Sequence, residues 1–448
     1  MKALSSMKIY DQPISSRLGS ILLYGVFGLL MFGPLAFGAV EPWSIFLVES
    51  GASLLLLLWV ARQLLDGGIK LRANPLFLPM AAFAALILFQ IAVHATAYRH
   101  DSINGAMILC AYAMLCFLLS QTLLRSSQAK KLAVILCIYG CAVAALALLG
   151  GVAPNGKLYW LREPRMGGWI YGPYVNHNHY AGLMEMLIPI PLVLALTQMA
   201  RKKERLIAAA GAALMAGTIF LSGSRGGMLA LLVELMLLGV IAIRKQKGMR
   251  LALIAATFLV ILGGLSIWLG GAELGHRIFS VSSDTRSEIS GDMRWNIDRD
   301  GFRMFLQHPL TGWGLGTFPV VYPQFRSFYT NFFVNQAHND YLQLLVETGL
   351  LGFGIMIWFL VVFYRQAWKK IANWTSDVGG AVSLACILGV TGILVHSALD
   401  FNLQIPANAA LFYALCTVGA AKPFAQPMRK RKPVKPPARE MVSASQVV

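Results

Sequence analysis

Long apolar runs recur along this chain from end to end, and they restrict it to one class of fold. Each run has about 20 residues, the length of α-helix that crosses the hydrocarbon core of a bilayer. Hydrophobic residues make up 57% of the 448 residues and charged residues only 13%, which is too little charge to cover a soluble protein of this size. The pattern predicts an all-α integral membrane protein.

We expect about 12 transmembrane helices. The run at residues 18–39 lacks a convincing small-residue cleavage pattern, so we interpret it as the first span rather than a cleaved signal peptide. The expected spans are residues 18–39, 43–65, 75–96, 103–124, 131–151, 179–199, 206–223, 226–243, 250–270, 343–364, 379–398 and 405–421.

The basic residues predict how these spans are oriented. Of the 38 Lys and Arg, 27 fall in the N-terminus, in alternate short loops and in the tail. Cytoplasmic loops are enriched in Lys and Arg, so we expect both termini to be cytoplasmic. The net charge of +18 then reflects topology and contact with anionic lipid heads, and it is no evidence for nucleic-acid binding.

The expected loops differ greatly in length. Two outer segments, residues 152–178 and 271–339, are long enough to suggest function. The chain is accordingly divided into a cytoplasmic N-terminus, nine spans, an outer loop that we expect to carry catalysis, three further spans and a basic cytoplasmic tail. Their bounds are 1–17, 18–270, 271–342, 343–421 and 422–448.

A polar cluster, Ala337-His338-Asn339-Asp340-Tyr341, precedes the span expected at 343–364. Ionisable residues at the edge of a span are costly and commonly functional, and histidine can transfer protons near neutral pH. Tyr341 shares a face with His338 if this segment is helical. The competing interpretation is an interfacial histidine at the start of a helix.

A second candidate is Arg225, which lies between two expected spans within Ser222-Gly-Ser-Arg-Gly-Gly227. A guanidinium can bind two phosphate oxygens at once, and the flanking glycines allow a ligand to approach the backbone. The alternative is an arginine that extends from the membrane edge into water. We favour the functional interpretation.

Two further polar segments stand beside expected spans. His177, Asn178 and His179 suit sugar hydroxyls or phosphates, although two histidines at i and i+2 do not share a helix face and so do not favour a metal pair. Helix capping is an equally good explanation of that segment. Asp400 lies in the connection between the last two spans, where it could orient another polar group or simply cap a turn.

Residues 292–307 have the pattern of a short amphipathic helix, with Trp295, Phe302 and Phe305 as its apolar residues. Asp298 and Asp300 within it match a spacing that some sugar-nucleotide enzymes use for a divalent metal. That spacing is common by chance, so we expect both carboxylates on the outer face of the helix. No metal site and no cofactor are expected.

In these residues the chain resembles the O-antigen ligase and polymerase superfamily of polytopic bacterial membrane proteins. The order of the pieces along the chain is more specific than any one piece. They are residues 176–182, Ser224-Arg-Gly-Gly227, Arg294-Trp295, residues 308–314, His338-Asn-Asp-Tyr341, Glu347-Thr-Gly349 and residues 396–406.

The resemblance implies a fold like that of the GT-C glycosyltransferases and an active site at the periplasmic face of the inner membrane. Ligases of this superfamily transfer a glycan from an undecaprenyl-diphosphate donor to the lipid A core. Polymerases extend one lipid-linked glycan with another, and a third branch glycosylates proteins. Chain length and the context of His338 resemble the ligases most.

The resemblance also suggests roles. His338 is the expected general base, and arginines, with Arg225 first and Arg294 and Arg286 next, would bind the diphosphate in a metal-independent, inverting transfer. Residues expected to contact substrate are Arg286, His177, Asn178, His179, Asn339, Asp340, Tyr341 and Asp400.

A transporter or flippase for a lipid-linked glycan is the alternative from another class of protein. It predicts internal repeats and charged residues near the middle of the membrane. Glu49, Glu185 and Glu234 are the embedded candidates, and no repeat relates them. The polar motifs gather instead on the outer side, which favours transfer chemistry.

Overall fold

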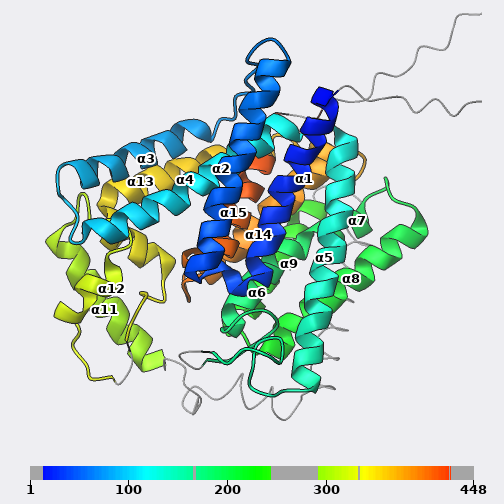
Figure 1. The fold of residues 1–448 in the computed structure, drawn as a ribbon. Coiled ribbons are helices and arrows are strands. Elements are labelled where there is room, and N and C mark those ends of the chain that lie inside the picture. Colours follow the sequence, from blue (N-terminus) through cyan, green and yellow to red (C-terminus); the bar gives the residue numbers. More distant parts are fainter. Residues whose placement is uncertain (1–13, 165–167, 244–290, 331–332, 423, 425–448) are drawn as a thin grey trace, which may run out of the picture.

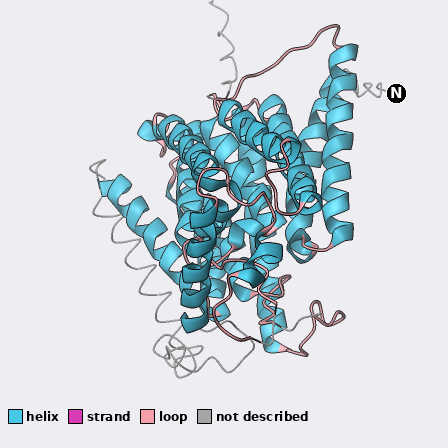
Figure 2. Ribbon diagram, turned by 90° about the vertical axis from the view of Figure 1, so that its left-hand side faces the viewer, coloured by secondary structure: helices cyan, strands magenta, loops and turns pink. Residues whose placement is uncertain are grey.

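The computed structural model describes residues 14–164, 168–243, 291–330, 333–422 and 424. Within these residues the chain forms α-helices joined by loops and short 3₁₀ turns, without a strand (Figure 2). The expectation of an all-α protein is confirmed. The helices are α1 Ile14–Leu35, α2 Pro42–Leu65, α3 Phe77–Ala92, α4 Arg99–Thr122, α5 Ser126–Val152, α6 His177–Leu187, α7 Pro189–Leu196, α8 Lys202–Ser222, α9 Arg225–Ile243, α11 Gly291–Gln307, α12 Phe318–Val321, α13 Asp340–Trp368, α14 Val378–His396 and α15 Pro406–Ala420.

The helices have the lengths and composition of membrane spans. Among the described residues, nine are long and apolar enough to cross a membrane, with α6 and α7 counted as one. The shorter α3 and α15 are also apolar. Each of these eleven coincides with an expected span, whereas the span expected at 250–270 lies outside the described residues. The protein is therefore a polytopic all-α membrane protein.

The most enclosed elements are α6, α7, α14 and α15, which lie inside the bundle (Figure 1). The span formed by α6 and α7 is 94% buried. Other helices surround it on nearly all sides, and its buried residues include the polar start of α6 as well as apolar side chains. Pro189 and Pro191 follow Leu187 and split the span in two, because proline lacks the amide hydrogen that continues a helix.

A clasp holds the outer loop against α13. Gly349 interrupts that helix with φ 63° and ψ −167°, a backbone conformation that is essentially restricted to glycine. Trp313 N donates to Val346 O at 2.9 Å, and Leu350 N donates to Pro309 O at 2.8 Å. The Glu347 carboxylate accepts from Gly316 N at 2.9 Å. We call this set of bonds between residues 308–318 and 346–351 the loop clasp.

The helix ends form two opposite poles. The basic end carries Lys130, Arg201 and Lys369, and the site end carries the starts of α6, α9 and α13 with the last residue of α14. Because an α-helix rises about 1.5 Å per residue, the 19 residues of α14 separate these poles by roughly 28 Å.

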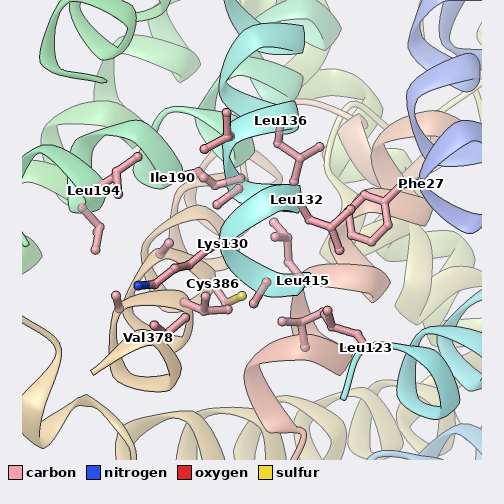
Figure 3. A pocket seen from close by; sticks show the side chains of 18 of the residues that line it. Phe27, Leu123, Lys130, Leu132, Leu136, Ile190, Leu194, Val378, Cys386 and Leu415 are labelled. Atoms are coloured by element: carbon pink, nitrogen blue, oxygen red, sulfur yellow. The ribbon is translucent and has the colours of Figure 1, made fainter. Parts of the chain in front are cut away.

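A partly open cavity of about 1320 Å³ lies near the basic end, between α5, α7, α14 and α15. Figure 3 shows its apolar side chains, among them Leu132, Ile190 and Leu415, with the amine of Lys130 beside them. Polar groups that could perform chemistry gather at the other pole. This cavity is therefore part of the hydrophobic bundle and not the candidate site.

Candidate functional site

His338 occupies the turn immediately before α13. Its φ of +55° is unusual for a residue other than glycine, and such backbone strain is concentrated at functional sites. The imidazole stands edge-on to the ring of Phe401, with ring centroids 4.7 Å apart. His338 is thus held in one orientation at the site end, with 12% of its side chain exposed.

Asp400 is the nearest charged partner of His338, at 3.4 Å between Nδ1 and Oδ1. This distance is long for a hydrogen bond, but contacts of catalytic groups often shorten when substrate binds. A carboxylate at Nδ1 favours the tautomer that carries its proton there, which leaves Nε2 as the basic atom. His338 and Asp400 therefore have the arrangement of a base and the group that orients it.

Asp400 also connects this dyad to two other segments. Its Oδ2 accepts a hydrogen bond from Asn178 Nδ2 at 2.7 Å and lies 3.9 Å from an Arg294 guanidinium nitrogen. Arg294 additionally donates to Leu399 O at 3.1 Å. The expectation that Asp400 orients another polar group agrees with this geometry. The pKa of Asp400 lies well below its usual range, because burial, which raises it, is outweighed by His338 and Arg294.

A polar pocket of about 470 Å³ adjoins the dyad. The starts of α6 and α9 both border it, and helix N-termini carry partial positive charge and unpaired amide hydrogens that suit anions. The pocket thus combines two arginines, two helix starts and two histidines around one space. Its lining residues are Trp169, His177, Asn178, Gly223, Arg225, Gly226, Arg294, His396, Leu399 and Asp400.

Arg225 is the first residue of α9 and is exposed at the pocket. The chain reaches it through Gly223, whose φ of +75° ends α8 in the left-handed conformation that favours glycine. Ser224 then accepts from Gly227 N at 3.2 Å and caps α9. The small residues around Arg225 therefore make the tight reversal that brings its guanidinium to the pocket.

The two histidines at the start of α6 take different places. His177 lines the pocket, stacks on Trp169 at 4.4 Å between ring centroids, and donates from Nδ1 to Ser222 O at 2.8 Å. His179 lies behind, edge-on to Phe401 at 4.6 Å. The separation expected from their i, i+2 spacing is observed.

Beside His338, the polar residues at the start of α13 bind other parts of the protein. Asn339 caps α13 by accepting from Tyr341 N and Leu342 N. Asp340 is buried and accepts from Leu403 N at 2.9 Å, and the Tyr341 hydroxyl donates to Leu394 O at 2.6 Å. Asn339 thus caps α13 itself, whereas Tyr341 and Asp340 fasten the start of α13 to α14 and to the connection that follows it. Arg286 lies outside the described residues.

The helix α11 covers the start of α13, but its faces differ from those expected. Ile297, Met304 and Phe305 are buried against α13 and α12, whereas Trp295 is 71% and Phe302 51% exposed. Phe305 therefore packs inside the protein, whereas Trp295 and Phe302 lie on the outside of the bundle. Arg294 and Asp298, one turn apart, are both close enough to the dyad to affect its electrostatics.

The expectation that both carboxylates lie on the outer face of the helix was wrong for Asp300. Asp300 is fully buried, and its Oδ2 accepts from Ser327 N at 2.8 Å and from Ser327 Oγ at 2.9 Å. Tertiary contact with the segment at residue 327 has overridden the simple amphipathic pattern. Asp298 is half-buried, and burial raises its pKa to about 6 against the opposing charges of His338 and Arg294.

The middle of the chain matches the model of a known protein family. Residues 210–357 match the family model described as O-antigen ligase. We call residues 210–357 the O-antigen ligase region. The resemblance to the O-antigen ligase and polymerase superfamily is therefore confirmed. No curated protein matches the chain.

The O-antigen ligase region contains part of the site and leaves the rest to flanking segments. Arg225, Arg294 and His338 lie within residues 210–357. Asn178 and Asp400 lie on either side of it, yet they are hydrogen-bonded to each other. Residues that precede and follow the matched region therefore complete the site in the folded protein.

Two functional candidates were missed from the sequence. His396 lines the pocket and pairs with Glu185, with 2.7 Å between Nδ1 and Oε1. These residues are 211 positions apart, and neither local periodicity nor spacing indicates such a contact. Glu185 itself was noted only as an embedded carboxylate for the transport alternative.

An apolar groove leads away from the pocket. It is lined by Leu229 of α9, Tyr341 of α13, and Leu394 and Val395 of α14. Leu399 borders both the groove and the polar pocket. A polar chamber thus adjoins an apolar path, the combination that fits an amphiphile with an anionic head.

Proposed function

We propose that this protein is an O-antigen ligase. It transfers a polysaccharide from an undecaprenyl-diphosphate donor to the lipid A-core oligosaccharide, in lipopolysaccharide biosynthesis at the periplasmic face of the bacterial inner membrane. One observation carries the proposal: within the site of an O-antigen ligase region, the His338–Asp400 dyad adjoins a polar pocket that contains Arg225 and Arg294.

The donor binds across the two adjoining spaces. Its diphosphate lies in the polar pocket, where guanidinium groups and helix starts suit phosphate oxygens. Its polyprenyl tail lies along the apolar groove between α9, α13 and α14. Leu399 stands between the two spaces, at the level where the lipid meets its head group.

The transfer is a single displacement that inverts the anomeric centre. The acceptor hydroxyl attacks the anomeric carbon, a new carbon–oxygen bond forms, and the bond from that carbon to the diphosphate oxygen breaks. The bonding electrons pass to the diphosphate, where Arg225 and Arg294 stabilise the charge. His338 takes the hydroxyl proton at Nε2, and general bases of this kind accelerate reactions by about 10²–10⁴-fold.

The remaining predicted residues are assigned supporting roles. Asn178 and Asp400 orient His338, and His177 forms the pocket wall with Trp169. Asn339, Asp340 and Tyr341 position the start of α13. We propose that the outer loop at 271–342 covers the reaction and limits hydrolysis of the donor, and that both termini are cytoplasmic.

The direct test uses purified protein with undecaprenyl-diphosphate-linked glycan and lipid A-core acceptor, separately and together. Ligation predicts a glycosylated lipid A core only when both are present. A lengthened lipid-linked glycan from donor alone indicates a polymerase instead. Release of no lipid diphosphate under any condition, in protein that remains monodisperse, contradicts transfer and favours a transport role.

A further inference from the structure

One buried ion pair beside the pocket, between His396 and Glu185, has no role in the mechanism proposed above. His396 is the last residue of α14, and its Nδ1 lies 2.7 Å from Glu185 Oε1 of α6. The two side chains are 1% and 0% exposed. Ionisable side chains inside a membrane protein are expensive to bury, and they commonly mark functional pathways and sites.

The hydrogen-bonding capacity of this pair is not fully used by the residues that the structure describes. Glu185 Oε2 is buried and makes no hydrogen bond to the residues that the structure describes. Buried polar groups in a purely structural role are normally satisfied, so packing alone does not account for this pair.

The free edge of the His396 ring faces the start of α9. A Cβ atom on Gly226 would lie 2.5 Å from Cδ2 and 2.6 Å from Nε2 of the ring. Only glycine at this residue leaves room for the imidazole beside the first turn of α9. His396 thereby reaches the polar pocket that Arg225 and Arg294 also line.

The electrostatic setting favours a cation at this residue. Glu185 contacts one ring nitrogen, and His396 occupies the C-terminus of α14, where the helix dipole stabilises positive charge. Asp400 borders the same pocket from the other side, where Arg294 and Asn178 contact it. An imidazolium held by Glu185 therefore presents its second N–H to whatever anion enters the pocket.

We propose that His396, held by Glu185, is a third donor to the diphosphate of the lipid-linked substrate, beside Arg225 and Arg294. This inference rests on the proposed function. As the carbon–oxygen bond to the diphosphate breaks, its electron pair moves to the phosphate oxygen, and His396 Nε2–H donates a hydrogen bond to that charge. No proton leaves His396, since the acceptor proton goes to His338. Glu185 is a positioning residue that acts through His396.

The test compares three isosteric or near-isosteric variants. His396→Gln removes the cation, Glu185→Gln keeps a hydrogen-bond partner but removes the charge that holds it, and Glu234→Gln is the matched control among buried carboxylates. We expect His396→Gln to lower kcat/KM for the donor by about 10²-fold, a typical effect of losing one donor to a developing anion. The KM for the acceptor should not change.

Binding of undecaprenyl diphosphate, without any glycan, separates this inference from the proposed function. His396→Gln and Glu185→Gln should each weaken binding about tenfold, whereas Glu234→Gln should bind like wild type. Thermal unfolding of each variant shows whether it is folded, and Glu185→Gln serves if His396→Gln is not. Wild-type affinity and turnover in folded His396→Gln overturn the inference. If wild type makes no product but binds the lipid in a His396-dependent way, only the transfer reaction is refuted.

Discussion

At the scale of single residues, the site is organised around the Asp400 carboxylate, which several polar side chains contact. Asp400 accepts from Asn178 and contacts both His338 and Arg294. Its low pKa, set by these neighbours against the effect of burial, keeps it ionised wherever the protein is folded. One group near the site that titrates in an accessible pH range is Asp298, whose pKa burial raises to about 6.

Asp298 should make folding stability depend on pH in a defined direction. Because its pKa is higher in the folded protein than in the unfolded chain, the folded state holds the proton more tightly. The stability this confers is present below about pH 4 and is lost as pH rises through about 6. Asp298→Asn should therefore raise Tm at pH 8 but not near pH 4. Since the side chain is about half exposed, we expect a gain of roughly 1 kcal/mol.

Thermal unfolding of the detergent-solubilised protein at the two pH values measures this effect. Asp66→Asn is the control, since it removes a carboxylate at the basic end. An equal change in Tm at both pH values would show that Asp298 is not the titrating group.

At the residue scale, some features of the site could be predicted from the sequence and others could not. Single residues with unusual surroundings, such as His338 and Arg225, could be singled out because a polar group beside an apolar run is conspicuous. The pairing of candidates could not be predicted, because Asn178 and Asp400 meet across 222 positions and only the packing of α6 against the turn after α14 brings them together.

At the scale of elements, the loop clasp explains why α13 contains Glu347 and Gly349 in an otherwise apolar span. Glu347 accepts backbone hydrogen bonds from Gly316, and Gly349 lets residues 309–311 approach the helix. A Cβ on Gly349 would lie too close to Leu310 O. The clasp fixes where α13 begins and hence where His338 stands.

Gly349→Ala should therefore destabilise the protein. Alanine would have to adopt φ 63° and ψ −167°, at a cost of about 1–3 kcal/mol before the steric contact with Leu310. We expect a lower Tm and a loss of transfer activity. Gly354→Ala is the matched control in the same helix, because a Cβ there meets nothing within 4 Å. Equal stability of the two variants would contradict the role of the clasp.

Elements as such were predictable because membrane spans follow from length and hydropathy. Eleven of the expected spans coincide with described helices. The faces of α11 were not predictable, because burial of Asp300 and exposure of Trp295 depend on the segments at residues 327 and 337 that pack over the helix.

At the scale of the whole molecule, the polar site and the large apolar cavity lie toward opposite ends of the helix bundle. The polar pocket and the dyad occupy the site end, and the large apolar cavity lies near the basic end. Under the proposed function, sugars are handled at one membrane face and the remaining helices hold the lipid-linked substrate.

The most direct test of this central claim is the rate of glycan transfer by purified protein in the presence of EDTA. Wild type should remain active, and His338→Ala and Arg225→Ala should each be slower by about 10²–10⁴-fold. His100→Ala and Arg299→Ala are matched controls at exposed residues and should retain activity. Activity lost in EDTA and restored by Mg²⁺ would instead implicate Asp298 or Asp300 in binding a metal. Transfer at the wild-type rate by folded His338→Ala and Arg225→Ala would contradict the assignment of the site.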